Sequence, residues 1–328
     1  MKNKLIFDPK EIESILGKEY KGLSTIFSDK IGIINVILRR FELEEYNLKM
    51  YQCLSADTKK IFDLSRDVGI SDTDKGAIIS CIAEAVERYC MSYIPKNELI
   101  KSYWNDIDDK YKIQDYQLYT DEQYDNNNNF FNPKKDKIYW TKISSVDEDK
   151  QLYWPAGLIY LPFELSKNVA ETSSTGMAAG YTIKDCILSG LLELIERDSL
   201  MINFSKRLNP PEIDIDTIEG ANKEFINKIK EKYKIKIYKL YSDIEIPTYL
   251  CFIWNEKKGK PHYGIGASAN LDSDLAINKA LRECLFTHYY SLNIMDLRKD
   301  KPEDITTLYE HFLYYQGDFF EKLLFKEF

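Results

Sequence analysis

SCIAEAVERYC (residues 80–90) and SGLLELIERDS (residues 189–199) repeat one pattern, in which a serine is followed at fixed intervals by two glutamates and an arginine. These residues are Ser80, Glu84, Glu87 and Arg88 in the first copy and Ser189, Glu193, Glu196 and Arg197 in the second. Positions i, i+4, i+7 and i+8 share one face of an α-helix. The remaining positions are mostly apolar, which predicts two buried helices that each carry one charged stripe.

The charges of this pattern need partners if the helices are buried. Burying one unpaired carboxylate costs several kcal/mol, and carboxylates three residues apart repel each other. Arg88 and Arg197 balance only two of the four glutamates. The remaining carboxylate oxygens are hard ligands of the kind that holds Mg2+ together with substrate phosphates. A salt-bridged stripe on a solvated helix face is the alternative, and the repetition in two apolar segments favours the magnesium site.

The composition excludes several classes of protein. The chain has 328 residues, 44% of them hydrophobic, so it can bury a large core as one large domain or two closely packed ones. Its net charge of −8 argues against a nucleic-acid partner. No apolar run approaches ~18 residues, and the N-terminus lacks the apolar region of a signal peptide. We therefore expect a soluble, cytoplasmic protein, and the six scattered cysteines without a C-x-x-C pair indicate reduced core cysteines.

A loop of small residues precedes the second charged helix. Residues 173–180 read SSTGMAAG, and Thr182 with Asp185 predicts a capping box for the helix that follows. Small side chains let backbone N–H groups approach a ligand closely, and a helix N-terminus favours an anion. Next to a helix that carries carboxylates, this loop is a candidate phosphate-binding segment.

The other segments predict a mixture of helices and sheets. Strands are expected in residues 31–42, 47–55, 234–242 and 247–256, and an amphipathic helix is expected in residues 216–233. Residues 95–137 end in a long surface loop. Residues 262–292 contain the glycine-rich end of a strand, which continues into a helix with Lys279 and Glu283. Neither a G-x-G-x-x-G nor a P-loop motif occurs. The pattern favours an α+β fold with mixed or antiparallel sheets over a Rossmann sheet.

Several segments carry a family resemblance: SCIAEAVERYC (80–90), WPAGLIYLPF (154–163), SSTGMAAGYTIKDCILSGLLELIERDSL (173–200), NPPEIDID (209–216) and GASANLDSDLAINKALRECL (266–285). In this order they resemble the YcaO superfamily, and within it the SagD-like branch that matures thiazole/oxazole-modified peptides. The resemblance runs from about Asp67 to at least Tyr315. It implies a YcaO-type α+β fold in which helices carrying glutamates surround a non-P-loop ATP site.

The resemblance also assigns site residues. The Mg2+ ligands would be Glu84, Glu87, Glu193, Glu196 and Glu283, and the ATP-binding residues would be Ser80, Arg88, Ser174, Thr175, Arg197 and Lys279. Four positions depart from the pattern of this branch: Ile70 stands for a lysine, Thr175 for an asparagine, Lys279 for an arginine and Phe286 for a glutamine. Lysine keeps the charge of arginine but loses its bidentate geometry.

The activity implied is ATP-dependent cyclodehydration of a ribosomal peptide. A Cys, Ser or Thr side chain of the precursor peptide attacks the preceding carbonyl, ATP phosphorylates the carbonyl oxygen, and departure of phosphate leaves an azoline. Partners implied are the precursor peptide, a leader-binding protein and a flavin dehydrogenase, with a homodimer as a further expectation. Within the family, thioamide or amidine formation is an alternative. The alternative in which the protein is not an enzyme is a degenerate, non-catalytic scaffold subunit.

The expected domain organisation follows the same resemblance. Residues 1–66 would be an N-terminal sheet-forming segment of the YcaO domain, and residues 67–328 would be its body. The proline-rich C-terminus that such cyclodehydratases place near the active site is not evident in LYEHFLYYQGDFFEKLLFKEF (308–328).

Overall fold

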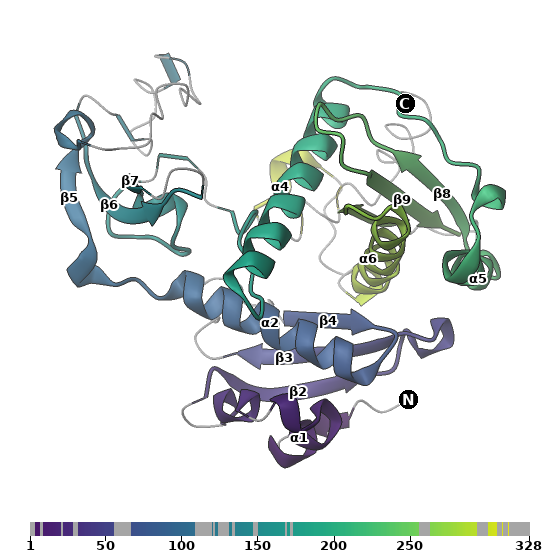
Figure 1. Cartoon of the computed structure of the whole chain (residues 1–328). Coiled ribbons are helices and arrows are strands. Elements are labelled where there is room, and N and C mark those ends of the chain that lie inside the picture. The colour runs from purple at the N-terminus through teal and green to yellow at the C-terminus, as the bar shows by residue number, and fades with distance from the viewer. Residues whose placement is uncertain are drawn as a thin grey trace.

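The computed structural model of the chain is shown in Figure 1. It describes residues 4–6, 9–20, 22–28, 32–55, 67–108, 120, 122–123, 131–132, 135–146, 150–167, 169–170, 173–255, 263–293, 301–306, 310 and 314. Most of the predicted surface loop before 137 and the C-terminal segment after 314 lie outside these residues. Short 3-10 helices span Lys18–Tyr20, Leu23–Ile26, Glu44–Tyr46, Lys96–Glu98, Trp104–Asp106, Ala156–Leu158, Ile215–Thr217 and Pro302–Asp304.

The N-terminal sheet is antiparallel and carries two helices. Its strands are β1 (Lys4–Ile6), β2 (Ile34–Arg40), β3 (Lys49–Ser55) and β4 (Asp67–Ser71), in that order, and its helices are α1 (Pro9–Leu16) and α2 (Asp74–Ser92). Helix α2 buries Ala77, Ile78 and Cys81 in a core shared with β2 and β3. This sheet crosses the expected boundary between residues 66 and 67, and the division into two segments stays a prediction.

A second antiparallel sheet supports the last charged helix. Its order is β10-β9-β8, with β8 at Lys234–Lys239, β9 at Thr248–Trp254 and β10 at Tyr263–Ala269, and helices α5 (Gly220–Lys230) and α6 (Ser273–Asn293) belong to the same unit. Helix α6 lies directly along β10 because Gly266 has no side chain: a Cβ there would stand 2.2 Å from the carbonyl oxygen of Ala280. A third sheet joins β5 (Ile100–Tyr103), β6 (Lys137–Ser144) and β7 (Gln151–Pro155). The predicted α+β class with antiparallel sheets is confirmed.

Helix α4 (Ile183–Ser205) stands between the β5–β7 sheet and the β8–β10 sheet (Figure 1). The prediction that both charged helices are buried is right for α2 and wrong for α4. Only Gly190, Ser199 and Asn203 of α4 are buried, whereas Leu188, Leu191 and Leu194 are about half exposed. The reason is that α2 lies flat on a sheet, while α4 contacts β9 and β10 along a narrow stripe only.

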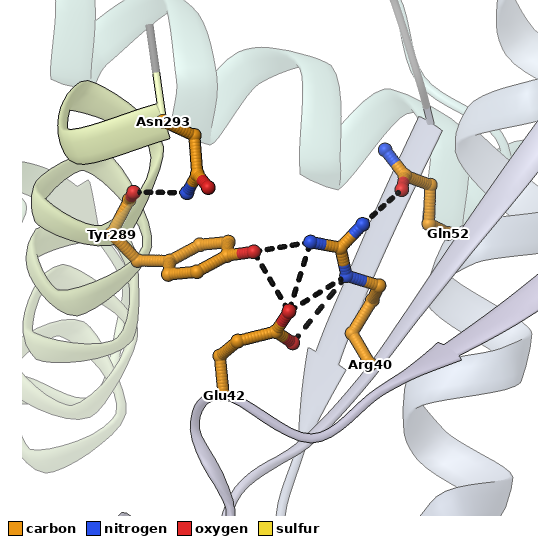
Figure 2. A network of polar contacts seen from close by, with 5 residues as sticks. All are labelled: Arg40, Glu42, Gln52, Tyr289 and Asn293. Atoms are coloured by element: carbon orange, nitrogen blue, oxygen red, sulfur yellow. Dashed lines mark hydrogen bonds and ion pairs between the residues drawn. The ribbon is translucent and has the colours of Figure 1, made fainter. Parts of the chain in front are cut away.

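The first and second sheets are joined by a shared core and by a polar network. Leu48 and Met50 pack with Ile226, Ile277 and other residues of the α5–α6 unit. In the network of Figure 2, the hydroxyl of Tyr289 on α6 donates to Glu42 at 2.8 Å and also bonds the Arg40 guanidinium. Arg40 donates in turn to Glu42 at 2.9 Å and to Gln52 at 3.4 Å, and the Asn293 amide donates to the Tyr289 carbonyl. These contacts fix α6, and Glu283 on it, relative to β2 and β3.

The structure also bears on the predictions about the cysteines and about membrane spans. Cys53 of β3 and Cys81 of α2 form a buried disulfide, so the expectation of reduced cysteines is wrong for this pair, because the fold stacks the two residues face to face. Cys90, Cys186, Cys251 and Cys284 are free. Within the described residues, none of the helices has both the length and the apolar character that crossing a membrane requires.

Candidate nucleotide and metal site

The first charged stripe lies on the side of α2 that faces β4, the edge strand of its sheet. Thr73 caps the helix by accepting a hydrogen bond from the Gly76 N–H. Three turns later, Glu84 accepts from the Val68 N–H of β4 at 2.7 Å and from the Arg88 guanidinium at 2.6 Å. The same guanidinium contacts the fully buried carboxylate of Asp67 at 2.9 Å. Glu84 is therefore held by one backbone donor and one cation.

The small-residue loop folds back onto α4. The Gly176 N–H donates to the Glu193 carboxylate at 3.2 Å, and Gly176 has a positive φ of 87°, which favours glycine. Gly190 of α4 makes this approach possible, because a Cβ there would stand 2.4 Å from the Gly176 carbonyl oxygen. The predicted capping box of Thr182 and Asp185 at the start of α4 is confirmed.

The third group of carboxylates joins α4 to α6. Glu283 of α6 accepts from the Ala267 N–H of β10 at 2.9 Å. Glu196 of α4 accepts a backbone hydrogen bond from Ala269, two residues further along the same strand. Arg197 contacts Glu196 at 3.3 Å and Glu193 at 3.7 Å. A strand of small residues thus supplies backbone donors to glutamates of two different helices.

The electrostatics of these glutamates show that the three helices converge. The pKa of Glu87 is raised to about 7, mainly by burial and in addition by the nearby carboxylates of Glu84 and Glu193. Burial and then the carboxylate of Glu283 raise the pKa of Glu196 to about 8. Burial and the carboxylate of Glu193 also raise the pKa of Glu283. The pKa of each carboxyl is raised by a carboxylate of a neighbouring helix, so Arg88 and Arg197 do not neutralise all of the glutamates, and some of these carboxyls stay protonated near neutral pH unless a further cation binds.

The cluster suits a cation that arrives with a ligand of its own. Among the described residues, no three His, Cys, Asp or Glu side chains form a group ready to hold a metal ion. Arg88 and Arg197 already contact three of the glutamates. Mg2+, however, is commonly held by one or two carboxylates together with substrate phosphates, so a closed cage is not required. The hard oxygen donors, and the carboxyls that the arginines do not neutralise, fit Mg2+ bound with a phosphate chain.

The remaining predicted site residues lie around the cluster. Ser80 of α2, one turn before Glu84, and Lys279 of α6, one turn before Glu283, are exposed. Ser174 and Thr175 are half-buried in the loop beside Gly176, and the Thr175 N–H bonds the Ser173 hydroxyl. Within the described part of the chain, no direct bond joins any of these four to a glutamate of the cluster.

Sequence reasoning missed several contributors to this site. Asp67 lies far from the charged stripes in sequence, and burial raises its pKa to about 6 although Arg88 is beside it. The backbone donors Val68, Ala267 and Ala269 are also new, and only the small side chains of β10 hint at a close backbone approach. Arg282, which follows Lys279 by three residues, was not singled out, and burial lowers its pKa.

Comparisons with known proteins identify the family and the fold of this chain. The model of the YcaO cyclodehydratase family, described as ATP- and Mg2+-binding, matches residues 68–322. An uncharacterized protein of Methanothermobacter thermautotrophicus is 22% identical over 268 residues, which are 78% of this chain and 66% of that protein. The chain therefore spans slightly less than two thirds of the length of this curated relative.

Solved structures show the same fold. A heterocyclase in complex with substrate and cofactor matches with a TM-score of 0.74 and 20% identity, over 96% of this chain and 44% of that one. YcaO from Methanopyrus kandleri, bound with AMPPCP and Mg2+, matches with a TM-score of 0.63 and 19% identity, over 87% and 69%. The E. coli microcin synthetase McbBCD complex matches with a TM-score of 0.67 and 16% identity, over 89% and 74%. Because the family model covers most of its length, this chain belongs to the YcaO family of ATP- and Mg2+-binding proteins.

Proposed function

We propose that this chain uses ATP and Mg2+ to modify a backbone amide of a ribosomal peptide, by cyclodehydration of a Cys, Ser or Thr residue to an azoline. The observation that carries the proposal is the convergence of glutamates from α2, α4 and α6, each of which accepts a hydrogen bond from a backbone N–H. Such anchoring holds carboxylates in place before a ligand binds, which is what positioning of a phosphate chain requires.

The proposed roles follow from where each residue lies. Bound Mg2+ would neutralise the phosphates and increase the reactivity of the γ-phosphoryl group. Its ligands would come from two sets, Glu84 and Glu87 on α2 and Glu193, Glu196 and Glu283 on α4 and α6. The nucleotide itself would contact Ser80, Arg88, Ser174, Thr175, Arg197 and Lys279. Arg88 and Arg197 now contact carboxylates, and each would turn part of its guanidinium toward phosphate when Mg2+ takes over those carboxylates.

The chemical step needs little acid–base catalysis from the protein. The substrate side chain provides the nucleophile and loses its hydroxyl or thiol proton. Its attack on the preceding carbonyl carbon places negative charge on the oxygen, and that oxygen takes the γ-phosphoryl group of ATP, which leaves ADP. Phosphate then leaves with this oxygen and the amide nitrogen loses its proton as the C=N bond forms, so the peptide loses one water overall. Histidine is scarce, and His288, which lies in the described part, is buried against Tyr233 away from the glutamates.

Calorimetry with Mg-ATP tests the proposal. We expect the wild type to bind Mg-ATP and Glu196→Gln to lose that binding, because the variant cannot supply a carboxylate where α4 meets α6. Absence of binding to the intact wild type would remove the proposal. Incubation with a precursor peptide and a leader-binding partner protein should then give loss of water by mass spectrometry, whereas replacement of oxygen by sulfur would indicate thioamide formation. A flavin dehydrogenase would act after the azoline has formed.

One observation favours a non-catalytic scaffold subunit as the second candidate. The arginines already contact three of the glutamates, and within the described residues no group of three metal ligands is preformed. The McbBCD complex among the structural neighbours is an assembly of several proteins, in which a subunit could serve binding alone. Binding of a precursor peptide or partner by purified protein that does not bind Mg-ATP would establish this role.

A further inference from the structure

Arg282 of α6 is a cation with an incomplete set of partners. It directly precedes Glu283, and its side chain is only 24% exposed. Its ion-pair partner is Asp72, in the turn between β4 and α2, at 3.9 Å. Arg282 therefore reaches from the last charged helix toward the start of the first one.

The contact between Arg282 and Asp72 is too long to satisfy a buried guanidinium. Charge-assisted hydrogen bonds between arginine and carboxylate measure about 2.7–2.9 Å. The Asp72 side chain is 72% exposed and accepts a hydrogen bond from the Ser71 hydroxyl at 2.9 Å, and the Arg282 Nε is buried without a hydrogen-bond partner. Arg88, by contrast, contacts Glu84 at 2.6 Å and Asp67 at 2.9 Å. A buried cation in this position is costly unless an anion comes to it.

The surroundings indicate which anion that is. Lys279 lies three residues before Arg282, and residues three apart are neighbours on a helix surface. Lys279 also lies one helical turn before Glu283, so it is a surface neighbour both of Arg282 and of the carboxylate cluster. A guanidinium presents several N–H groups in one plane, which match the oxygens of a phosphate group. A polyphosphate whose metal ions are held by the glutamates would carry the negative oxygens that Arg282 lacks.

We propose that Arg282 is a phosphate-binding residue, which contacts the phosphate chain of the nucleotide from the α6 side of the site. The identity of the anion rests on the proposed function, whereas the capacity to bind phosphate oxygens rests on Arg282 itself. Asp72 holds the guanidinium loosely when no ligand is bound and competes with the phosphate for it.

Two variants with opposite expected effects test this role. Arg282→Gln should weaken binding of Mg-ATP, and of Mg-tripolyphosphate, by about ten- to a hundredfold, since a hydrogen bond to a charged group is lost. Asp72→Asn should leave both affinities unchanged or increase them, because a competing carboxylate is removed. Arg282→Lys should retain part of the affinity through its charge. Calorimetry measures all affinities, and circular dichroism verifies that each variant is folded.

The possible results separate this proposal from the proposed function. Affinities of Arg282→Gln within twofold of the wild type would overturn the role of Arg282. Equal weakening by Arg282→Gln and Asp72→Asn would also overturn it, since the arginine would then serve only as the structural partner of Asp72. Loss of Mg-tripolyphosphate binding in Arg282→Gln, with no Mg-ATP binding by the wild type, would uphold the phosphate site and refute the nucleotide function.

Discussion

Replacing Glu196 by glutamine should stabilise the metal-free protein, although Glu196 lies in the proposed site. Its side chain is 14% exposed, and its pKa of about 8 compares with an ordinary value of 4.5. A carboxyl whose pKa is raised on folding contributes stability below its unfolded pKa and loses it as the pH rises through the folded value. The wild type therefore becomes less stable between about pH 4.5 and pH 8, and the glutamine variant does not.

The magnitude follows from the same two values. Each pH unit between them corresponds to about 1.4 kcal/mol, so the variant should exceed the wild type by about 3 kcal/mol at pH 7 and by about 5 kcal/mol above pH 8. Loss of the contact with Arg197 subtracts less than about 1 kcal/mol, because that guanidinium is 48% exposed. Mg2+ should reduce the difference above pH 8 to about 2 kcal/mol, since a ligand at a hundred times its Kd stabilises the wild type by about 2.7 kcal/mol and has no site in the variant.

Urea denaturation at several pH values between 5 and 9, with EDTA or with Mg2+, measures these differences. Asp198→Asn is the matched control: Asp198 is an exposed carboxylate on the same helix, and surface changes usually alter stability by less than about 0.5 kcal/mol. Parallel stability curves for the wild type and Glu196→Gln across this pH range would refute the reasoning, because they would show that burial and Glu283 do not disfavour the charged form of Glu196.

Three further predictions concern the supports of the site. The Gly190→Ala variant should have a free energy of unfolding about 1–2 kcal/mol lower than the wild type and should bind Mg-ATP more weakly, because the new Cβ displaces Gly176. A gain in stability of about 1 kcal/mol, from helix propensity alone, would contradict the close approach of Gly190 to Gly176. Tyr289→Phe should cost about 1–2 kcal/mol, since the hydroxyl bonds Arg40 and Glu42, and an unchanged urea midpoint would argue against the network. Calorimetric Mg2+ affinity should increase from pH 6 to pH 9, because protons compete for the two glutamates with pKa values of about 7 and 8; an affinity independent of pH would exclude them as ligands.

Local patterns in the sequence were sufficient for much of the fold. The strand runs before residue 55, the amphipathic segment that became α5, and the strands β8 and β9 follow directly from hydrophobic periodicity. The cap of α4 was equally predictable, since Thr182 and Asp185 form the expected capping box. These features depend on residues close together in the chain, so sequence contains the information they need.

Burial was harder to predict than helix formation. The two charged segments have similar patterns, yet α2 is buried against a sheet and α4 leaves Leu188, Leu191 and Leu194 half exposed. Periodicity predicts that a segment is helical and which positions share a face. It does not state what lies against that face, because this depends on contacts between elements far apart in the chain.

The sequence by itself determined helices α2, α4, α5 and α6, the repeated arrangement of serine, glutamate and arginine, and the family. Only the tertiary structure decided which groups meet: the Val68, Gly176 and Ala267 N–H groups at the glutamates, Asp67 beside Arg88, and Arg282 facing Asp72. The physical reason is that a glutamate's pKa and partners depend on burial and on charges brought within a few ångströms by packing, and neither is encoded by spacing along one helix.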